Sequence, residues 1–184
     1  MKKFVVIFSL FFSITVSGQK LVATASGLRD SSNIEKTFVV INVEGKTAKE
    51  LYENAVKYIN KAYRSADDVI KGKTEGEYLK FITTAPDFAY YKFGFGKVFI
   101  DGKYTVELTF RDGKVKYEVI ELLMFKLTDG FMNNYFFKDN LMGVFNSRLK
   151  LAKPELKTSL EFYFNHEIKS LTDALNEKHK NDNW

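Results

Sequence analysis

The chain has 184 residues, no cysteine and a formal net charge of +5. Its hydrophobic content of 45% and aromatic content of 16% are typical of a packed globular protein and argue against a disordered chain. The absence of cysteine excludes disulfide bonds, thiol catalysis and a lipid-modified cysteine. The basic residues form no clustered basic face, so we expect no nucleic-acid partner.

The first eighteen residues have the layout of a secretory signal peptide. Lys2 and Lys3 precede an apolar run that extends to Ile14, and small residues follow at 16–18. The run is too short and too interrupted to stay in a bilayer as an anchor. We therefore expect a mature chain that begins at Gln19 and is exported, either periplasmic or secreted, with no transmembrane anchor after cleavage.

The remainder divides into a polar leader, a single folded domain and a polar tail. We place the leader at 19–35, one α+β domain at 36–178 and the tail at 179–184. The sequence contains no internal repeat and no linker that would split the domain in two.

The N-terminal part of the domain predicts a strand followed by a helix. The apolar, β-branched run at 38–43 is suited to a buried strand. Thr47 and Glu50 match a capping box, and apolar residues recur with helical spacing after them, which predicts a helix over 48–64.

Strands then dominate. We expect short strands at 69–70 and 78–84, a turn at 85–87, and a three-stranded antiparallel meander at about 90–100, 103–111 and 114–124. Two Asp-Gly pairs, Asp101-Gly102 and Asp112-Gly113, mark the expected hairpin turns of this meander.

Strict alternation in the meander predicts one buried and one exposed face. Apolar side chains occupy the buried face: Tyr104, Val106, Leu108, Phe110, Val115, Tyr117 and Val119. Polar side chains occupy the exposed face, which includes Thr105, Glu107, Thr109, Lys116 and Glu118.

The C-terminal part begins with an unclear pattern. Residues 127–138 are typical of an aromatic-rich loop, and apolar residues between 141 and 149 favour a short helix. Pro154 then starts a long amphipathic helix with one apolar stripe: Leu160, Phe164, Ile168, Leu171 and Leu175. The sequence thus predicts an α+β fold of two layers, an antiparallel sheet of five to six strands covered on one face by two main helices.

Several local segments resemble a family of exported bacterial domains of unknown function. They are the strand and capped helix with its 58–63 segment, the Gly94–Lys97 segment, Tyr104-Thr105-Val106, and the segment 111–117. The family is described as having a TATA-binding-protein-like (TBP-like) fold. The resemblance covers about 37–125 and implies this architecture and export, but no reaction. Since fold does not determine function, DNA binding is not implied.

Candidate catalytic and metal sites are sparse. The only histidines, His166 and His179, lie thirteen residues apart with no cysteine to complete a metal site. A Gly-x-Ser-x-Gly elbow is absent. Asp67 and Asp68 are adjacent carboxylates in a turn, a position that favours solvated charges over an acid/base pair. We expect no catalytic residue, no metal and no cofactor.

Aromatic density is the feature that points to binding. Five aromatic residues lie within eight positions and form a candidate binding patch: Phe88, Tyr90, Tyr91, Phe93 and Phe95. A second group lies at 131–137. Either the second group covers the first as core, which the sequence favours, or one face points outward and binds a sugar or a protein.

The sequence favours an exported, non-catalytic domain that binds or assembles with an envelope component, such as a protein or a glycan. Two alternatives stay open, a carrier of a small ligand or lipid and a carboxylate-based hydrolase. A mildly cationic strip between Lys138 and Lys157 is compatible with acidic polymers or anionic lipid, although a solvated loop and helix start is the simpler interpretation.

Overall fold

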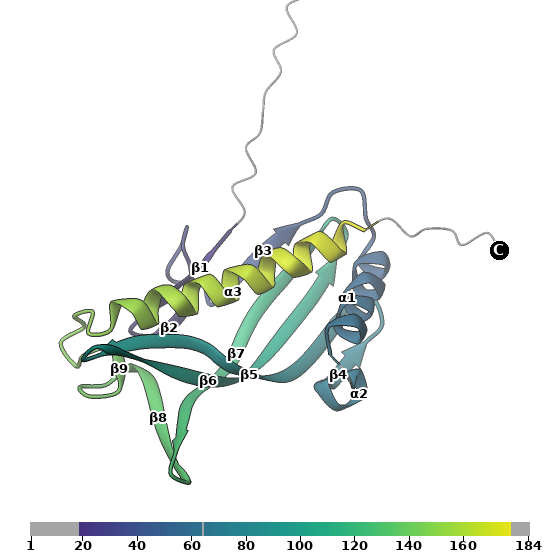
Figure 1. Ribbon diagram of the computed structural model, residues 1–184. Helices are drawn as coiled ribbons and strands as arrows, with labels where there is room; N and C mark the ends of the chain where they lie inside the picture. The colour runs from purple at the N-terminus through teal and green to yellow at the C-terminus, as the bar shows by residue number, and fades with distance from the viewer. Residues whose placement is uncertain (1–18, 64, 178–184) are drawn as a thin grey trace, which may run out of the picture.

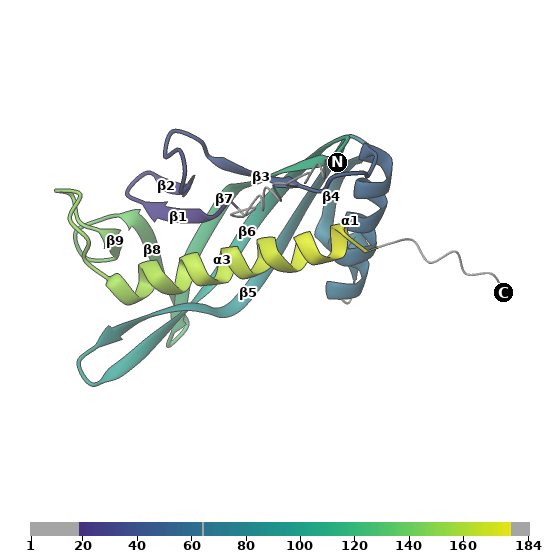
Figure 2. The same ribbon diagram turned by 90° about the horizontal axis from the view of Figure 1, so that it is seen from above.

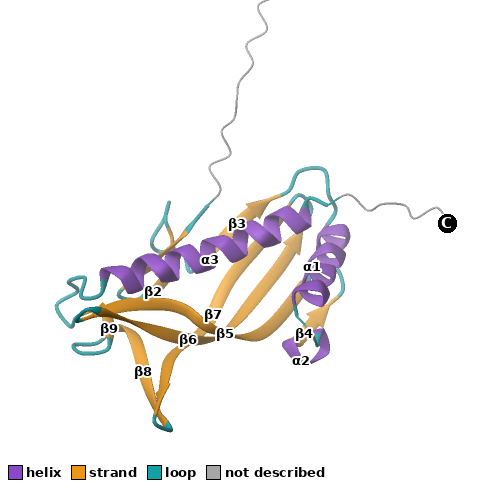
Figure 3. Ribbon diagram, viewed as in Figure 1, coloured by secondary structure: helices purple, strands orange, loops and turns teal. Residues whose placement is uncertain are grey.

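The computed structural model describes residues 19–63 and 65–177, so the predicted signal peptide and the tail at 179–184 lie outside the described residues. The fold is α+β, with a seven-stranded sheet, a separate two-stranded hairpin and two long helices (Figure 3). The predicted α+β class is confirmed, and the sheet has more strands than the five to six expected.

Helices and strands do not alternate regularly along the chain, and β4 to β9 follow one another without a helix between them. The strands are β1 (Leu21–Thr24), β2 (Gly27–Asp30), β3 (Phe38–Asn42), β4 (Ile70–Thr74), β5 (Tyr78–Phe93), β6 (Gly96–Arg111), β7 (Lys114–Thr128), β8 (Phe131–Lys138) and β9 (Gly143–Phe145). The helices are α1 (Ala48–Ala62), α2 (Ala66–Val69) and α3 (Pro154–Leu175). The large sheet has the order β4-β5-β6-β7-β8-β9, and β3 pairs with β7. The pairings are antiparallel except that of β8 with β9.

Both long helices cover the same face of the sheet, as the sequence predicts (Figures 1 and 2). The ring of Tyr52 on α1 packs edge-on against Phe110, with centroids 5.6 Å apart. Phe164 on α3 packs against Tyr104 at 5.2 Å. The helices therefore close an apolar layer over one side and leave the other side, here called the outer face, uncovered.

Local chemistry sets the helix starts. The Thr47 side chain accepts a hydrogen bond from the Glu50 amide, and the Glu50 carboxylate accepts one from the Thr47 amide at 2.8 Å, which confirms the capping box. Pro154 is the first residue of α3, where its missing N–H costs no helical hydrogen bond.

The alternation on β6 and β7 is confirmed. Val106 and Leu108 are completely buried, and each contributes about 1.5–3 kcal/mol through removal from water. Glu107 and Thr109 point to the outer face and stay partly exposed. Thr105 lies on the same face but is buried, and its hydroxyl donates a hydrogen bond at 2.9 Å to Glu121, beside a bulge in β7.

One of the two predicted Asp-Gly turns is wrong. Asp112-Gly113 connects β6 to β7, but Asp101-Gly102 lies inside β6, and the β5–β6 turn occurs at Gly94. The dipeptide instead supports a bulge in β5, because Asp101 accepts a hydrogen bond from the Asp87 amide at 2.9 Å. The predicted turn at 85–87 is this bulge within a continuous strand.

Gly102 is required for close packing. The ring of Phe88 lies 2.8 Å from where a Cβ atom at Gly102 would sit, which is too close for any other residue without movement. Asp-Gly therefore serves a close approach here rather than a turn.

Two further expectations near the C-terminus are wrong. Residues 131–138 form β8 rather than a loop, and the predicted short helix within 141–149 is replaced by β9 and turns. The Asp139 carboxylate accepts hydrogen bonds from the Leu141 and Met142 amides and orders the turn that precedes β9. Before β4, residues 66–69 form α2, so the expected strand at 69–70 starts one residue later.

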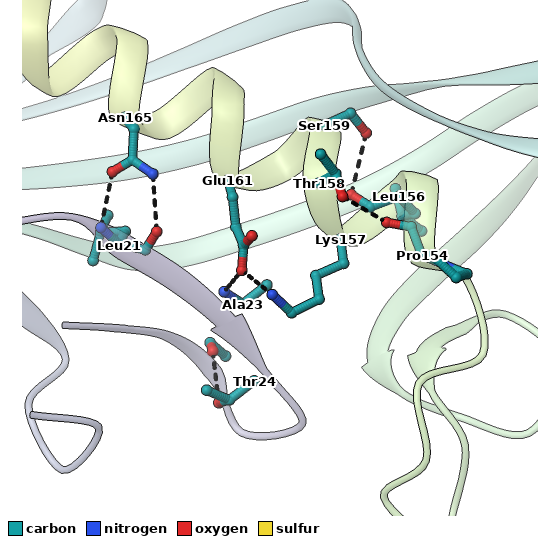
Figure 4. Close-up of polar contacts among 11 residues, drawn as sticks. Leu21, Ala23, Thr24, Pro154, Leu156, Lys157, Thr158, Ser159, Glu161 and Asn165 are labelled. Atoms are coloured by element: carbon teal, nitrogen blue, oxygen red, sulfur yellow. Dashed lines mark hydrogen bonds and ion pairs between the residues drawn. The ribbon is translucent and has the colours of Figure 1, made fainter. Parts of the chain in front are cut away.

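The expected polar leader is largely structured. Leu21, Ala23 and Leu28 of the β1–β2 hairpin are buried against the core, so the packed body begins at Leu21 rather than at residue 36. Asn165 on α3 both donates to the Leu21 carbonyl and accepts from the Leu21 amide, each at 2.9 Å, and Glu161 accepts from the Ala23 amide (Figure 4).

Within residues 19–63 and 65–177, no helix has the length and apolar character needed to cross a bilayer.

Candidate functional site

The five residues of the predicted patch do not form one surface. Phe88 is core: it is 7% exposed and packs edge-on against Tyr163 at 5.3 Å and Phe164 at 6.3 Å. The β5 bulge turns it toward α3, so the core interpretation is correct for this residue.

Tyr90 and Tyr91 are half-buried and hold the β5–β6 hairpin in place. Tyr91 packs against Tyr135 of β8 with ring centroids 5.7 Å apart. The Tyr90 ring contacts Phe99, and its amide donates a hydrogen bond to the Ser159 hydroxyl of α3 at 3.1 Å. This bond caps the edge of β5, which has no neighbouring strand there.

Phe93 and Phe95 are exposed at the end of the β5–β6 hairpin. Phe93 is 74% exposed and Phe95 is fully exposed. Phe99 is also exposed; it lies on β6, opposite Tyr90, farther from the turn. The hairpin thus presents bare phenyl rings to solvent.

The β7–β8 hairpin is a second segment with exposed apolar side chains. Leu127 and Met132 are directly paired and exposed, and Phe131 lies beside the turn with most of its ring in solvent. Met124 and Tyr135, on the opposite face, are buried. Figure 1 shows this hairpin projecting from the sheet on the side away from α3.

A third exposed apolar segment connects β8 to α3. Leu141, Leu149 and Leu151 are exposed, and Leu149 has a positive φ of 61°. Asn146 accepts hydrogen bonds from the Arg148 and Lys150 amides, so the turn that carries these residues is ordered by its own side chains.

These three segments gather most of the exposed apolar surface of the described chain at the end of the molecule opposite α1 (Figures 1 and 2). Of the fourteen large apolar side chains that are exposed in the described residues, eleven belong to them. We call this set the apolar end: Phe93, Phe95, Phe99, Leu123, Leu127, Phe131, Met132, Phe136, Leu141, Leu149 and Leu151. Exposed apolar side chains that gather in this way make the apolar end a candidate interaction surface.

Basic side chains border the apolar end. Lys97 lies over the Tyr90 ring at 4.5 Å, and Arg148 and Lys150 are exposed beside Leu149. Lys126 makes only a long 3.9 Å contact to Asp87. The cationic strip noted in the sequence therefore lies next to apolar side chains.

Several polar side chains on the outer face near α1 pair with one another. Glu107 accepts a hydrogen bond from Tyr78 at 2.7 Å and lies 3.6 Å from Lys80. Burial and this hydrogen bond raise the pKa of Tyr78 to about 12. Burial opposes ionisation of Glu118, but hydrogen bonds from Lys116 and Thr37 outweigh it and lower the pKa of Glu118.

A layer of tyrosines lies between the sheet and the helices. The hydroxyls of Tyr104 and Tyr163 are 2.8 Å apart, and burial raises the pKa of Tyr163 to about 12. Burial also raises the pKa of Glu167, against a smaller opposite effect of His166. The two tyrosine hydroxyls satisfy each other inside this layer.

The arrangement offers little for catalysis. Asp67 and Asp68 are exposed on the single turn of α2. His166 stacks on Phe162 at the surface of α3, and His179 lies outside the described residues. No group of three metal-ligating side chains occurs in residues 19–63 and 65–177.

Sequence reasoning found part of the apolar end. It identified the 88–95 segment and mentioned the 131–137 group, but it missed Leu127, Leu141 and Leu149, because single leucines in expected loops carry no pattern. The exposed positions Phe93 and Phe95 beside Gly94 and Gly96 are the one local signal, since glycines on both sides of an aromatic residue mark a hairpin end.

Two solved structures resemble this chain. A DUF4468 family protein from Bacteroides ovatus superposes with a TM-score of 0.55 at 11% identity, over 77% of this chain and 85% of that one. A TBP-like protein from Parabacteroides distasonis gives 0.54 at 15% identity, over 77% and 92%. These likenesses confirm the TBP-like fold expected from the sequence. No protein-family model matches the chain, and no curated protein matches it significantly.

Proposed function

We propose that this chain is an exported, non-catalytic domain that attaches to a lipid surface of the cell envelope through its apolar end. The observation that carries the proposal is the concentration of exposed Phe, Leu and Met side chains at the ends of three separate segments. The predicted signal peptide supports the compartment.

A flat partner fits three separate contact points better than a pocket-filling ligand does. Phe95, Phe131 and Leu141 each stand at or next to a turn, so each can enter a membrane interface without disturbing the sheet. Removing such side chains from water contributes about 25 cal/mol per Å². Bordering cations such as Arg148 and Lys150 add about 1 kcal/mol each near an anionic surface.

The alternatives have weaker support. Sugar binding favours an aromatic platform with hydrogen-bonding neighbours, whereas Leu127 and Met132 form an aliphatic pair. A lipid carrier needs an enclosed apolar cavity, and the layer between sheet and α3 is filled by side chains such as Tyr104, Leu160 and Phe164. A protein partner at the apolar end is an outcome that the experiment below separates.

Export is tested by the mass of the chain recovered from producing cells. The proposal expects a processed chain beginning at Gln19 in the periplasmic or secreted fraction. A full-length chain that stays in the cytoplasm would contradict it.

Lipid attachment is tested by co-sedimentation with vesicles of phosphatidylcholine, with and without phosphatidylglycerol. We expect binding that is stronger on the anionic vesicles. A Phe93→Ser/Phe95→Ser variant should lose at least about tenfold in affinity, because two exposed phenyl rings no longer enter the interface. Phe162→Ser is the matched control, since Phe162 on α3 is also 74% exposed but lies outside the apolar end.

All three proteins should melt at nearly the same temperature, because the substituted rings are mostly exposed to solvent. Failure of the unsubstituted chain to bind either vesicle, or equal losses in Phe162→Ser, would overturn the lipid surface as partner. If cross-linking from the apolar end in native envelopes then captured one protein, and the Phe93→Ser/Phe95→Ser variant lost it, a protein would replace lipid in the proposal.

A further inference from the structure

A second surface, on the outer face near α1, has the features of a small-ligand site and is independent of the apolar end. It is a hollow of about 400 Å³. Its lining comes from β3, β6 and β7: Phe38, Val40, Thr109, Arg111, Lys114 and Lys116. The volume is within the range of sites for small organic molecules.

The hollow carries unpaired positive charge. Arg111 and Lys114 are exposed, and neither side chain makes a hydrogen bond or ion pair with a described residue. The nearest acids in the sheet are already engaged, Glu107 by Tyr78 and Lys80, and Glu118 by Lys116 and Thr37.

Asp112, the acidic residue of the β6–β7 turn, does not neutralise Arg111 and Lys114. Asp112 accepts a hydrogen bond at 2.8 Å from the Ala48 amide, at the start of α1, so its carboxylate is directed to the helix. Arg111 and Lys114 are direct cross-strand partners. Like charges in this position repel each other, and an anion bound between them would relieve the repulsion.

The other side of the hollow is apolar. Phe38 and Val40 are half-buried neighbours on the outer face of β3, and the Lys116 ammonium lies 5.3 Å from the Phe38 ring. Lys116 is thereby fixed between Glu118 and the ring, while Arg111 remains free for a bidentate contact. The site therefore combines a planar cation with an adjacent ring and aliphatic surface.

We infer that this hollow binds a small organic anion, with its carboxylate or phosphate between Arg111 and Lys114 and its apolar part against Phe38 and Val40. Neither the cationic pair nor the apolar side chains alone would bind a ligand selectively, because the charges are screened by solvent and the apolar area is small. The two contributions together give the site its selectivity.

Four probes separate these contributions in an NMR titration of the full chain: benzoate, phenyl phosphate, inorganic phosphate and benzyl alcohol. We expect benzoate and phenyl phosphate to shift the amide signals of β3 and of the β6–β7 turn. Inorganic phosphate and benzyl alcohol should bind at least about tenfold more weakly, because each makes only one of the two contacts. The tighter of the two ring anions identifies the preferred charged group.

An Arg111→Gln/Lys114→Gln variant should weaken benzoate and phenyl phosphate binding by about tenfold or more. Lys57→Gln/Lys61→Gln is the matched control, since it removes the same charge from two exposed lysines on α1 and should leave binding unchanged. Equal losses in the two variants, shifts scattered over the surface, or binding of inorganic phosphate as strong as that of phenyl phosphate would overturn the inference. None of these results depends on lipid binding.

Discussion

Glu118 and Glu167 are both partly buried carboxylates, but their surroundings have opposite effects. Glu118 accepts hydrogen bonds from Lys116 and Thr37, which lower its pKa despite burial. Glu167 has no comparable donor, and burial raises its pKa. The first carboxylate therefore favours the folded state when it is ionised, and the second when it is protonated.

This contrast predicts opposite pH-dependent effects of two isosteric substitutions. Since the folded pKa of Glu118 lies below its unfolded value of about 4.3, its stabilisation is present above that pH and is lost as pH falls through the folded pKa. Glu118→Gln should lower the free energy of unfolding at neutral pH by about 0.5–1 kcal/mol, a size set by solvent screening of the ion pair. The difference should vanish in acid.

Glu167 follows the opposite sign. Its folded pKa is raised, so the unsubstituted chain loses stability as pH rises from about 4.3 through the folded pKa. Glu167→Gln should therefore raise the melting temperature at neutral pH and have no effect in acid. Thermal melts of both variants between acid and neutral pH check the pair, and a loss of stability in both at neutral pH would contradict the assignment.

At the scale of single elements, β5 and β6 show how a strand pair can bend without ending. The bulge between Ala85 and Ala89 directs Phe88 into the core, and Asp101-Gly102 on the opposite strand gives both the hydrogen bond and the space that the bulge needs. The exposed part of the hairpin beyond the bulge depends on this junction for its direction.

Gly102→Ala should therefore destabilise the protein by about 1–3 kcal/mol, because the added methyl group meets the Phe88 ring, which is held between Tyr163 and Phe164. Gly96→Ala on the same strand is the control, since its Cβ would make only an ordinary 3.8 Å contact. Denaturant unfolding of the two variants measures the difference. Equal stabilities would contradict the close approach.

The sequence predicted elements well where a regular pattern extended over several turns. α1, α3 and the alternating faces of β6 and β7 follow from spacing and capping alone. It failed where one motif has two uses: Asp101-Gly102 was expected as a turn, because an Asp-Gly pair that supports a bulge looks the same as one that forms a hairpin. It also failed at β1, where a four-residue strand is stabilised by Asn165 and Glu161, both more than 130 residues away along the chain.

For the whole molecule, the TBP-like arrangement explains why the apolar end exists. α1 and α3 cover one face of the sheet, and the long strands β5 to β8 extend beyond the part that α1 covers (Figure 2). Apolar side chains at their ends therefore stay in solvent. The candidate site could be predicted only in part because exposure depends on how far these hairpins reach past the helices, which local pattern does not encode.

The most direct test of the account uses the absence of native cysteine. Single cysteines introduced by Phe95→Cys, Phe131→Cys and Phe162→Cys each carry an environment-sensitive fluorophore, and its emission is recorded as anionic vesicles are added. Attachment through the apolar end predicts a blue shift at positions 95 and 131 and none at 162. An unchanged emission at all three positions, or an equal shift at 162, would contradict it.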